Sequence, residues 1–129
     1  MEWITCLKET LRYIEDNLRA EVDIGSAAKH VFVSPYHLQR GFQIVTGCTI
    51  GEYIRNRRLY EAARELTETD ARILDVALRW GYDTPESFTK AFTRFHGVTP
   101  VQVRQGACVR SFLPLNIRII VQGGNHMAY

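Results

Sequence analysis

Features of secreted and membrane proteins are missing from this sequence. Its three cysteines, Cys6, Cys48 and Cys108, form an odd and widely spaced set. Such a set argues against a disulfide framework and predicts a reducing compartment, which we take to be the cytoplasm. No apolar run is long enough to cross a bilayer, and residues 1–18 mix acidic with apolar side chains, unlike a signal peptide. The sequence therefore predicts a cytoplasmic protein with no membrane partner.

Motifs for catalysis and metal binding are missing as well. The histidines His30, His37, His96 and His126 are scattered, and no cysteine lies at metal-ligand spacing from another cysteine or a histidine. No carboxylate pair, glycine-rich phosphate loop or Ser/His/Asp grouping occurs in a recognisable motif. We therefore expect no enzymatic activity, no metal site and no cofactor.

The net charge of +2 is small, but the charged side chains are unevenly distributed. Residues 24–60 and residues 85–129 each contain five Lys or Arg and one Asp or Glu. Residues 1–23 and residues 61–84 each contain three basic and six acidic side chains. This distribution of charge suits a polyanionic partner that binds the two basic segments. The alternative interpretation is an ordinary solvated, charged surface.

Residues 50–66 contain no proline and many good helix formers, which predicts one continuous helix about 25 Å long. Its apolar residues lie on opposite sides in its two halves: Ile50, Tyr53 and Ile54 in the first, and Leu59, Ala62, Ala63 and Leu66 in the second. The two halves of a helix that changes its buried side in this way pack against two separate groups of helices. We therefore predict a rigid strut between two lobes, with residues 55–58 committed to neither lobe and the acids from Glu61 to Asp70 on a solvated face.

The segments on either side of this helix are similar to each other. Residues 24–53 align with residues 74–103 at a constant offset of fifty, without a gap, and five positions are identical. The identical pairs are Ala27 and Ala77, Pro35 and Pro85, Phe42 and Phe92, Gly47 and Gly97, and Thr49 and Thr99. Internal similarity at a fixed offset indicates a duplicated structural unit. Two unrelated helical pairs are the alternative.

Each repeat has the signals of two short helices joined by a tight turn. Ser34 and Thr84 are suitable N-caps, each followed by proline at the first helical position, and Gly47 and Gly97 are suitable C-caps. Apolar residues at i, i+4 and i+7 predict the buried stripes Leu38, Phe42, Val45 and Phe88, Phe92, Phe95. Two such helices form a helix-turn-helix, whose second helix enters the DNA major groove.

Residues 4–105 resemble the DNA-binding region of the AraC/XylS family of bacterial transcription regulators. The resemblance is carried by SPYHLQRGFQIVTGCTIGEYIRNRRLYEAARELTETD and by ILDVALRWGYDTPESFTKAFTRFHGVTPVQVR. It implies an all-α fold of about seven helices, in which two helix-turn-helix units in homeodomain-like three-helix lobes are bridged by a long helix. It also implies a monomer that binds double-stranded DNA through successive major grooves, as an activator that works beside RNA polymerase. Val103 departs from the family, which usually has tyrosine there.

The side chains expected to contact DNA follow from the helix-turn-helix and from the resemblance. Gln reads adenine edges, Arg and Lys read guanine, and aromatic or methyl groups touch thymine methyls. The predicted base-reading residues are Pro35, Tyr36, Gln39 and Arg40 in the first unit, and Pro85, Glu86, Ser87, Thr89 and Lys90 in the second. The predicted phosphate contacts are Ser34, Arg55, Arg57, Thr84 and Arg104. Glu86 is unusual, because it either accepts from a cytosine amino group or repels phosphate, and Arg57 has a structural alternative in Glu61 at i+4.

Residues 107–129 change from helical spacing to a β-branched run, IRIIV, followed by Gly-Gly, which predicts a strand or extended tail. We thus expect a DNA-binding region at 1–106, with lobes at about 3–48 and 71–106 and a linker helix at about 50–67. Some family members carry a C-terminal domain similar to the gyrase-inhibitory-protein fold, and a small-molecule effector is expected only if such a domain is missing here. A short tail packed on the second lobe is the alternative. For function, the alternative is a helical protein-interaction module that has lost DNA binding.

Overall fold

The computed structural model describes residues 2–116, and this part of the chain contains seven α-helices and no strand. The helices are α1 (Trp3–Asp16), α2 (Ile24–Val31), α3 (Pro35–Thr46), α4 (Ile50–Glu68), α5 (Ile73–Arg79), α6 (Pro85–His96) and α7 (Pro100–Arg104). The predicted all-α fold is confirmed. The IRIIV run lies outside the described residues. None of the described helices is long and apolar enough to span a membrane.

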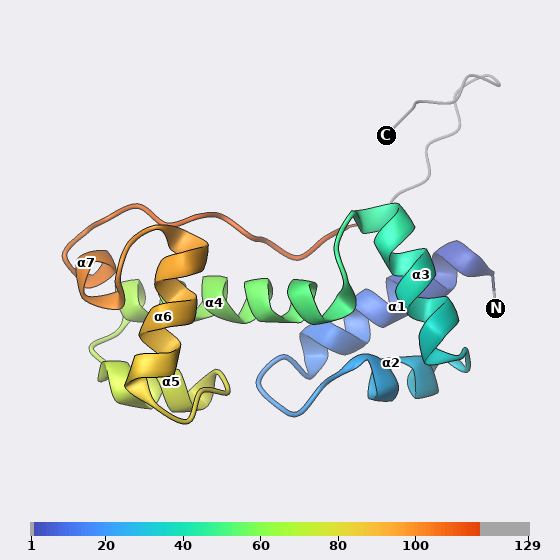
Figure 1. The fold of residues 1–129 in the computed structure, drawn as a ribbon, viewed down its shortest axis with the longest axis horizontal. Helices are drawn as coiled ribbons and strands as arrows, with labels where there is room; N and C mark the ends of the chain where they lie inside the picture. The colour runs from blue at the N-terminus through green and yellow to red at the C-terminus, as the bar shows by residue number, and fades with distance from the viewer. Residues whose placement is uncertain (1, 117–129) are drawn as a thin grey trace, which may run out of the picture.

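Helix α4 forms the long axis of the molecule (Figure 1). Helices α1 to α3 pack around one end of α4, and α5 to α7 pack around the other (Figure 1). Residues 107–116 have no regular secondary structure and return along α4 from the second lobe towards the first (Figure 1). The predicted pair of helix-turn-helix units joined by a long helix is therefore present.

The helix ends form where the capping residues predict them. The side chains of Ser34 and Thr84 accept hydrogen bonds from the backbone N–H groups of His37 and Ser87, at 3.2 and 3.1 Å. Thr49 caps α4 in a capping box with Glu52. Gly47 and Gly97 end α3 and α6 with φ values of 80° and 77°, a conformation that glycine adopts without steric cost.

Helix α4 changes its buried side as predicted. Ile50, Tyr53 and Ile54 are buried at the first-lobe end, and Leu59, Ala62, Ala63 and Leu66 are buried at the second-lobe end. The expectation that residues 55–58 belong to neither lobe is wrong. Arg57 is only 1% exposed, and Arg58 donates hydrogen bonds to the carbonyl oxygens of Leu18 and Ala20 at 2.8 and 2.7 Å. The middle of α4 is therefore tied to the segment between α1 and α2.

The two predicted core stripes are only partly buried. Leu38, Phe42, Phe88 and Phe92 are fully buried, but Val45 is 46% exposed and Phe95 is half-buried. Residue 46 lies about 40° from Phe42 around the helix, whereas residue 45 lies about 60° away on the other side. The stripe accordingly continues at i+8, and in α6 this places the buried His96 against the core.

Candidate nucleic-acid interface

The second helix of each unit presents its N-terminal end to solvent. In Figure 1, α3 and α6 run in the same direction, and their N-terminal ends lie towards the same, lower edge of the molecule. The nineteen residues of α4 that separate the two units correspond to about 28 Å of helix. This length is compatible with adjacent major grooves on one face of DNA, which are about 34 Å apart.

On α3, Tyr36 and Arg40 form an exposed pair one helical turn apart. Tyr36 is 66% exposed, and its hydroxyl accepts a hydrogen bond from Arg40 Nη1 at 3.2 Å. Pro35 is exposed beside them. Gln39 is half-buried, and its Oε1 accepts from the backbone N–H of Ile50 at 3.4 Å. Gln39 therefore contributes to the start of α4, and the bidentate adenine contact expected of it would require this bond to be given up.

On α6, the exposed predicted residues are Glu86, Ser87 and Lys90, whereas Pro85 and Thr89 are half-buried. The Ser87 hydroxyl donates to the carbonyl oxygen of Thr84 at 3.0 Å, and the Thr84 hydroxyl donates to Ser87 Oγ at 2.9 Å. These two side chains are thus engaged in capping α6. Glu86, Thr89 and Lys90 are better placed to contact bases.

The predicted phosphate-binding residues occupy different surroundings. Ser34, Arg55 and Thr84 are exposed. Arg104 is also exposed, but it donates to the carbonyl oxygens of Leu66 and Thr69, at 3.2 and 3.0 Å, and so caps the C-terminal end of α4. Arg94, an exposed residue of α6 one turn after Lys90, is not among the predicted contacts. Its spacing of four residues from Lys90 could have indicated it.

Arg55 and Arg94 line a shallow groove between α4 and α6 with a volume of about 410 Å³, and Arg110 of the tail lines it as well. Three arginines from separate segments give this groove positive charge. Glu52 at the same groove reduces that charge by one. A groove lined by three arginines is suited to binding phosphate oxygens.

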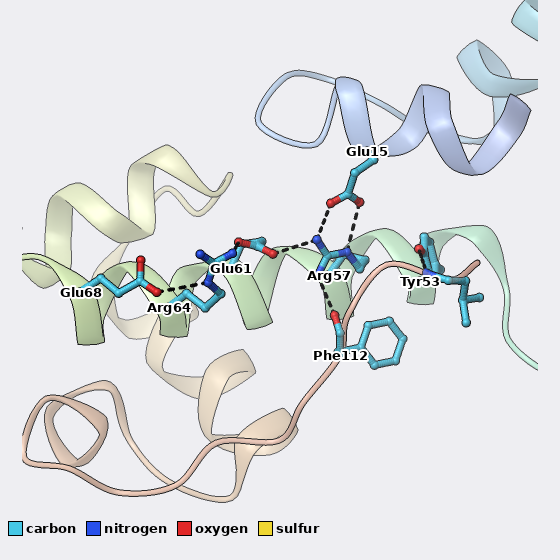
Figure 2. Close-up of polar contacts among 8 residues, drawn as sticks. Glu15, Tyr53, Arg57, Glu61, Arg64, Glu68 and Phe112 are labelled. Atoms are coloured by element: carbon cyan, nitrogen blue, oxygen red, sulfur yellow. Dashed lines mark hydrogen bonds and ion pairs between the residues drawn. The ribbon is translucent and has the colours of Figure 1, made fainter. Parts of the chain in front are cut away.

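Arg57 is the one predicted contact that the structure places in the interior (Figure 2). It makes a bidentate ion pair with Glu15 of α1, with Nε 3.1 Å from one carboxylate oxygen and Nη2 bonded to the other. Nη2 also donates to Glu61 Oε2 at 2.8 Å, and Nη1 donates to the carbonyl oxygen of Phe112 at 2.6 Å. The phosphate contact predicted for Arg57 is therefore wrong, because all of its nitrogens are engaged within the protein. The alternative pairing with Glu61 is confirmed.

The charge of this buried guanidinium is maintained by its partners. Burial by itself lowers the pKa of Arg57, but hydrogen bonds and charge interactions with Glu15 and Glu61 outweigh burial, and the pKa is raised. Glu61 also binds Arg64, at 3.0 Å, so its carboxylate joins two arginines (Figure 2). The expectation of a solvated face from Glu61 onwards is wrong for this residue.

His96 is a buried polar residue at the junction of α6, α4 and the tail. Its Nδ1 accepts from the backbone N–H of Arg110 at 3.1 Å, and its Nε2 lies 2.9 Å from the carbonyl oxygen of Leu59. Because a backbone N–H can only donate, Nδ1 must be unprotonated and Nε2 carries the proton. Burial lowers the pKa of His96, and the nearby charge of Arg110 acts in the same direction, against the hydrogen bond to Leu59.

We expect acidification to destabilise the fold through His96. A histidine whose pKa is lowered in the folded state stabilises the fold above its ordinary value of 6.5, and this stability is lost as the pH falls below that value. The loss should not exceed about 1.4 kcal/mol per pH unit for one proton. Thermal unfolding between pH 7.5 and 5.5 measures it. His96→Gln retains both hydrogen-bonding functions and should flatten the profile, and equal profiles for the parent and His96→Gln would contradict the assignment.

The class of the protein follows from this geometry and from its relatives. Residues 27–106 match a protein family described as a helix-turn-helix domain. The chain is 39% identical over 94 residues to the HTH-type transcriptional activator AarP of Providencia stuartii, covering 73% of this chain and 70% of that protein. An AraC-type regulator structure from Chromobacterium violaceum superposes with a TM-score of 0.76 at 24% identity, covering 79% of this chain and 91% of that chain.

A third comparison is with a protein solved on DNA. The DNA-binding domain of the global transcriptional factor AdpA, in complex with a target DNA, superposes with a TM-score of 0.71 at 25% identity and covers 77% of this chain and 89% of that chain. The fold and its exposed helices define a DNA-binding transcription regulator with two helix-turn-helix units. The chain belongs to the AraC/XylS family. Because this family consists of transcription regulators, the prediction that the chain is not an enzyme is confirmed.

Glu86 should lower the affinity of the second unit for DNA and increase its preference for cytosine at one position. Its carboxylate is exposed in the first turn of α6, the part of the helix predicted to contact base edges. We expect Glu86→Gln to raise affinity for all sequences, to steepen the dependence of log K on log salt by about one, and to weaken any preference for cytosine at one position. Titrations at several salt concentrations on matched DNAs measure this. Unchanged binding would place Glu86 outside the interface.

Proposed function

We propose that this regulator binds a long asymmetric DNA site as a monomer, with α3 in one major groove and α6 in the next, and that it activates transcription beside RNA polymerase. The observation that carries this proposal is the placement of α3 and α6, whose exposed N-terminal ends face the same edge of the molecule (Figure 1). Two reading helices within one chain provide two half-site contacts without a second subunit. We expect the measured mass of the protein–DNA complex to correspond to one protein chain per DNA site.

In the first groove, Arg40 is the main base-reading residue. Its guanidinium is exposed and oriented by the Tyr36 hydroxyl, and arginine binds the O6 and N7 atoms of guanine in a bidentate manner. The Tyr36 ring lies beside it and suits a thymine methyl group. Gln39 contributes less, because its oxygen already accepts from the backbone of α4.

In the second groove, Lys90 and Thr89 read bases. Glu86 repels phosphate oxygens and accepts a hydrogen bond from the amino group of a cytosine. Lys90 is exposed on the same face of α6 as Glu86, four residues further along the helix. Arg55 and Arg94, in the groove between α4 and α6, contact phosphates. Phosphate contacts by Ser34 and Thr84 at the helix starts require their hydroxyls to give up the bonds that cap α3 and α6. Arg104 adds to these contacts with the donors that do not cap α4.

Activation is supported by AarP, a relative named as a transcriptional activator and 39% identical over the matched residues. An activator must place itself at a fixed position relative to RNA polymerase, and an asymmetric site read by two different helices fixes both position and direction. The two reading surfaces are different here, since Tyr36, Gln39 and Arg40 correspond by the repeat to Glu86, Thr89 and Lys90. Transcription in vitro with purified RNA polymerase would test activation on the selected site.

The two-groove arrangement is tested by changing the DNA and leaving the protein unchanged. Binding sites are first selected from random DNA, and five base pairs, about half a helical turn, are then inserted between the two half-sites. We expect affinity to fall to that of a single half-site, because one reading helix would then face the wrong side of the duplex. Equal affinity for both DNAs would contradict the proposal. A weak dependence on salt would instead support the alternative of a protein-interaction module.

A further inference from the structure

We propose that residues 107–116, which we call the strap, fix the angle between the two lobes and thereby determine which half-site spacing the protein accepts. Phe112 and Tyr53 are the positioning residues of this device. The inference rests on the proposed reading of two grooves. It assigns to the tail a role in DNA recognition without direct contact with bases.

The strap begins on the second lobe, where α6 holds it. The backbone N–H of Arg110 donates to Nδ1 of the buried His96 at 3.1 Å. The guanidinium of Arg110 lies over the Phe95 ring, 4.5 Å from its centroid. Cation–π contact and a backbone hydrogen bond therefore fix Arg110 to two neighbouring residues of α6.

The middle of the strap bridges α6 to the first half of α4. The Phe112 ring lies against Phe95 of α6 and Tyr53 of α4, with ring centroids 5.8 Å apart in each pair. The Phe112 carbonyl oxygen accepts from Arg57, and Arg57 holds Glu15 of α1 (Figure 2). One residue of the strap thus contacts the second lobe by its ring and reaches the first lobe through a buried ion pair.

The strap reaches the first lobe at its far end. The backbone N–H of Leu115 donates to the Tyr53 hydroxyl at 3.0 Å. Tyr53 is 1% exposed and packs its ring against Phe42, in the core of the first lobe. Contacts at 110, 112 and 115 therefore run from the core of one lobe to the core of the other, parallel to α4 (Figure 1).

A second connection beside α4 matters because long helices bend. A bend of about 10° at the middle of α4 would move one end by roughly 2.5 Å, since half of the helix is about 14 Å long. Hydrogen bonds to base edges tolerate much smaller displacements than this. A strap fastened at both lobes resists such bending, and it should sharpen discrimination between correctly and incorrectly spaced half-sites.

The test compares variants of the full chain on three kinds of DNA: the selected site, the same site with one base pair inserted or removed between half-sites, and a single half-site. Phe112→Ala removes the ring that joins α6 to α4, and Tyr53→Phe removes only the hydroxyl bonded to Leu115 and keeps the buried ring. Leu113→Ala is the matched control, because Leu113 is 62% exposed and adjacent to Phe112. Thermal melts of each variant accompany the titrations.

We expect both strap variants to bind the selected site more weakly, about tenfold for Phe112→Ala and less for Tyr53→Phe, and to distinguish the spacing variants less well than the parent. Binding to the single half-site and binding by Leu113→Ala should not change. An unchanged spacing preference in folded strap variants would overturn the proposal, as would an equal loss on the selected site and the single half-site. If the parent protein bound all of the spacing variants equally well, the proposed reading of two grooves would be wrong. This outcome is measured on the parent protein and needs no variant.

Discussion

Arg57→Met is expected to destabilise the fold by about 3 kcal/mol while leaving the salt dependence of DNA binding unchanged. The substitution removes a fully buried guanidinium and leaves the carboxylates of Glu15 and Glu61 facing each other without their shared cation. Removing one partner of a buried pair costs about 3–5 kcal/mol, and the lower end applies because the Glu15 side chain is 33% exposed. The Phe112 carbonyl oxygen also loses its donor.

Urea unfolding measures the stability, and DNA titrations at several salt concentrations measure the number of phosphate contacts. Arg55→Met is the matched control, because Arg55 lies on the same helix two residues earlier and is exposed. It should change the free energy of unfolding by less than about 0.5 kcal/mol and should reduce the salt slope by about one. A reduced salt slope in Arg57→Met, with stability unchanged, would instead support the predicted phosphate contact of Arg57.

Arg40→Ala is expected to weaken binding to the selected site by about 1–3 kcal/mol, which is roughly a 5- to 150-fold loss, and to relax the preference at one guanine. The guanidinium is exposed and positioned by the Tyr36 hydroxyl at 3.2 Å, so its loss should remove the proposed base contact and leave the core intact. Competition titrations against DNAs substituted at single positions measure both effects.

The control for Arg40 is Arg12→Ala, which removes one positive charge from α1, where the side chain is 71% exposed. It corrects for the change in net charge, and we expect it to alter affinity only slightly and equally for all sequences. If Arg40→Ala weakened every DNA to the same extent, Arg40 would be a phosphate contact and the base-reading assignment for α3 would need revision.

Local signals in the sequence were sufficient for the helices and the duplicated units. Caps such as Ser34 and Thr84 act on N–H groups three residues away, and glycine ends a helix through its own backbone conformation. The change of buried side in α4 also follows from spacing alone. These features depend on residues that are close in the sequence, so a single sequence contains the information.

The contacts that were missed join residues far apart in the sequence. The sequence predicts Arg57 at the DNA surface, because its partner Glu15 lies 42 residues away on a helix whose orientation the sequence does not give. The sequence also predicts the acids of α4 in solvent, yet Glu65 accepts from Trp80 Nε1 at 3.0 Å. The course of residues 107–116 could not be predicted either, because their bonds to Tyr53, Arg57 and His96 span many residues. For the candidate site, residue types and helix positions were predictable, but whether each side chain is exposed was not.

The shared helix also has a consequence for how the protein unfolds. Helix α4 contributes buried side chains to both lobes, so each lobe is incomplete without one half of it. A helix segment of nine or ten residues is marginal in water by itself, since isolated helices shorter than about 12–15 residues are barely stable. Opening one lobe would expose an apolar face of α4 and weaken the helical half on which the other lobe depends. The two lobes should therefore behave as one cooperative folding unit, and a protease that cuts within α4 would release neither lobe as an independently stable domain.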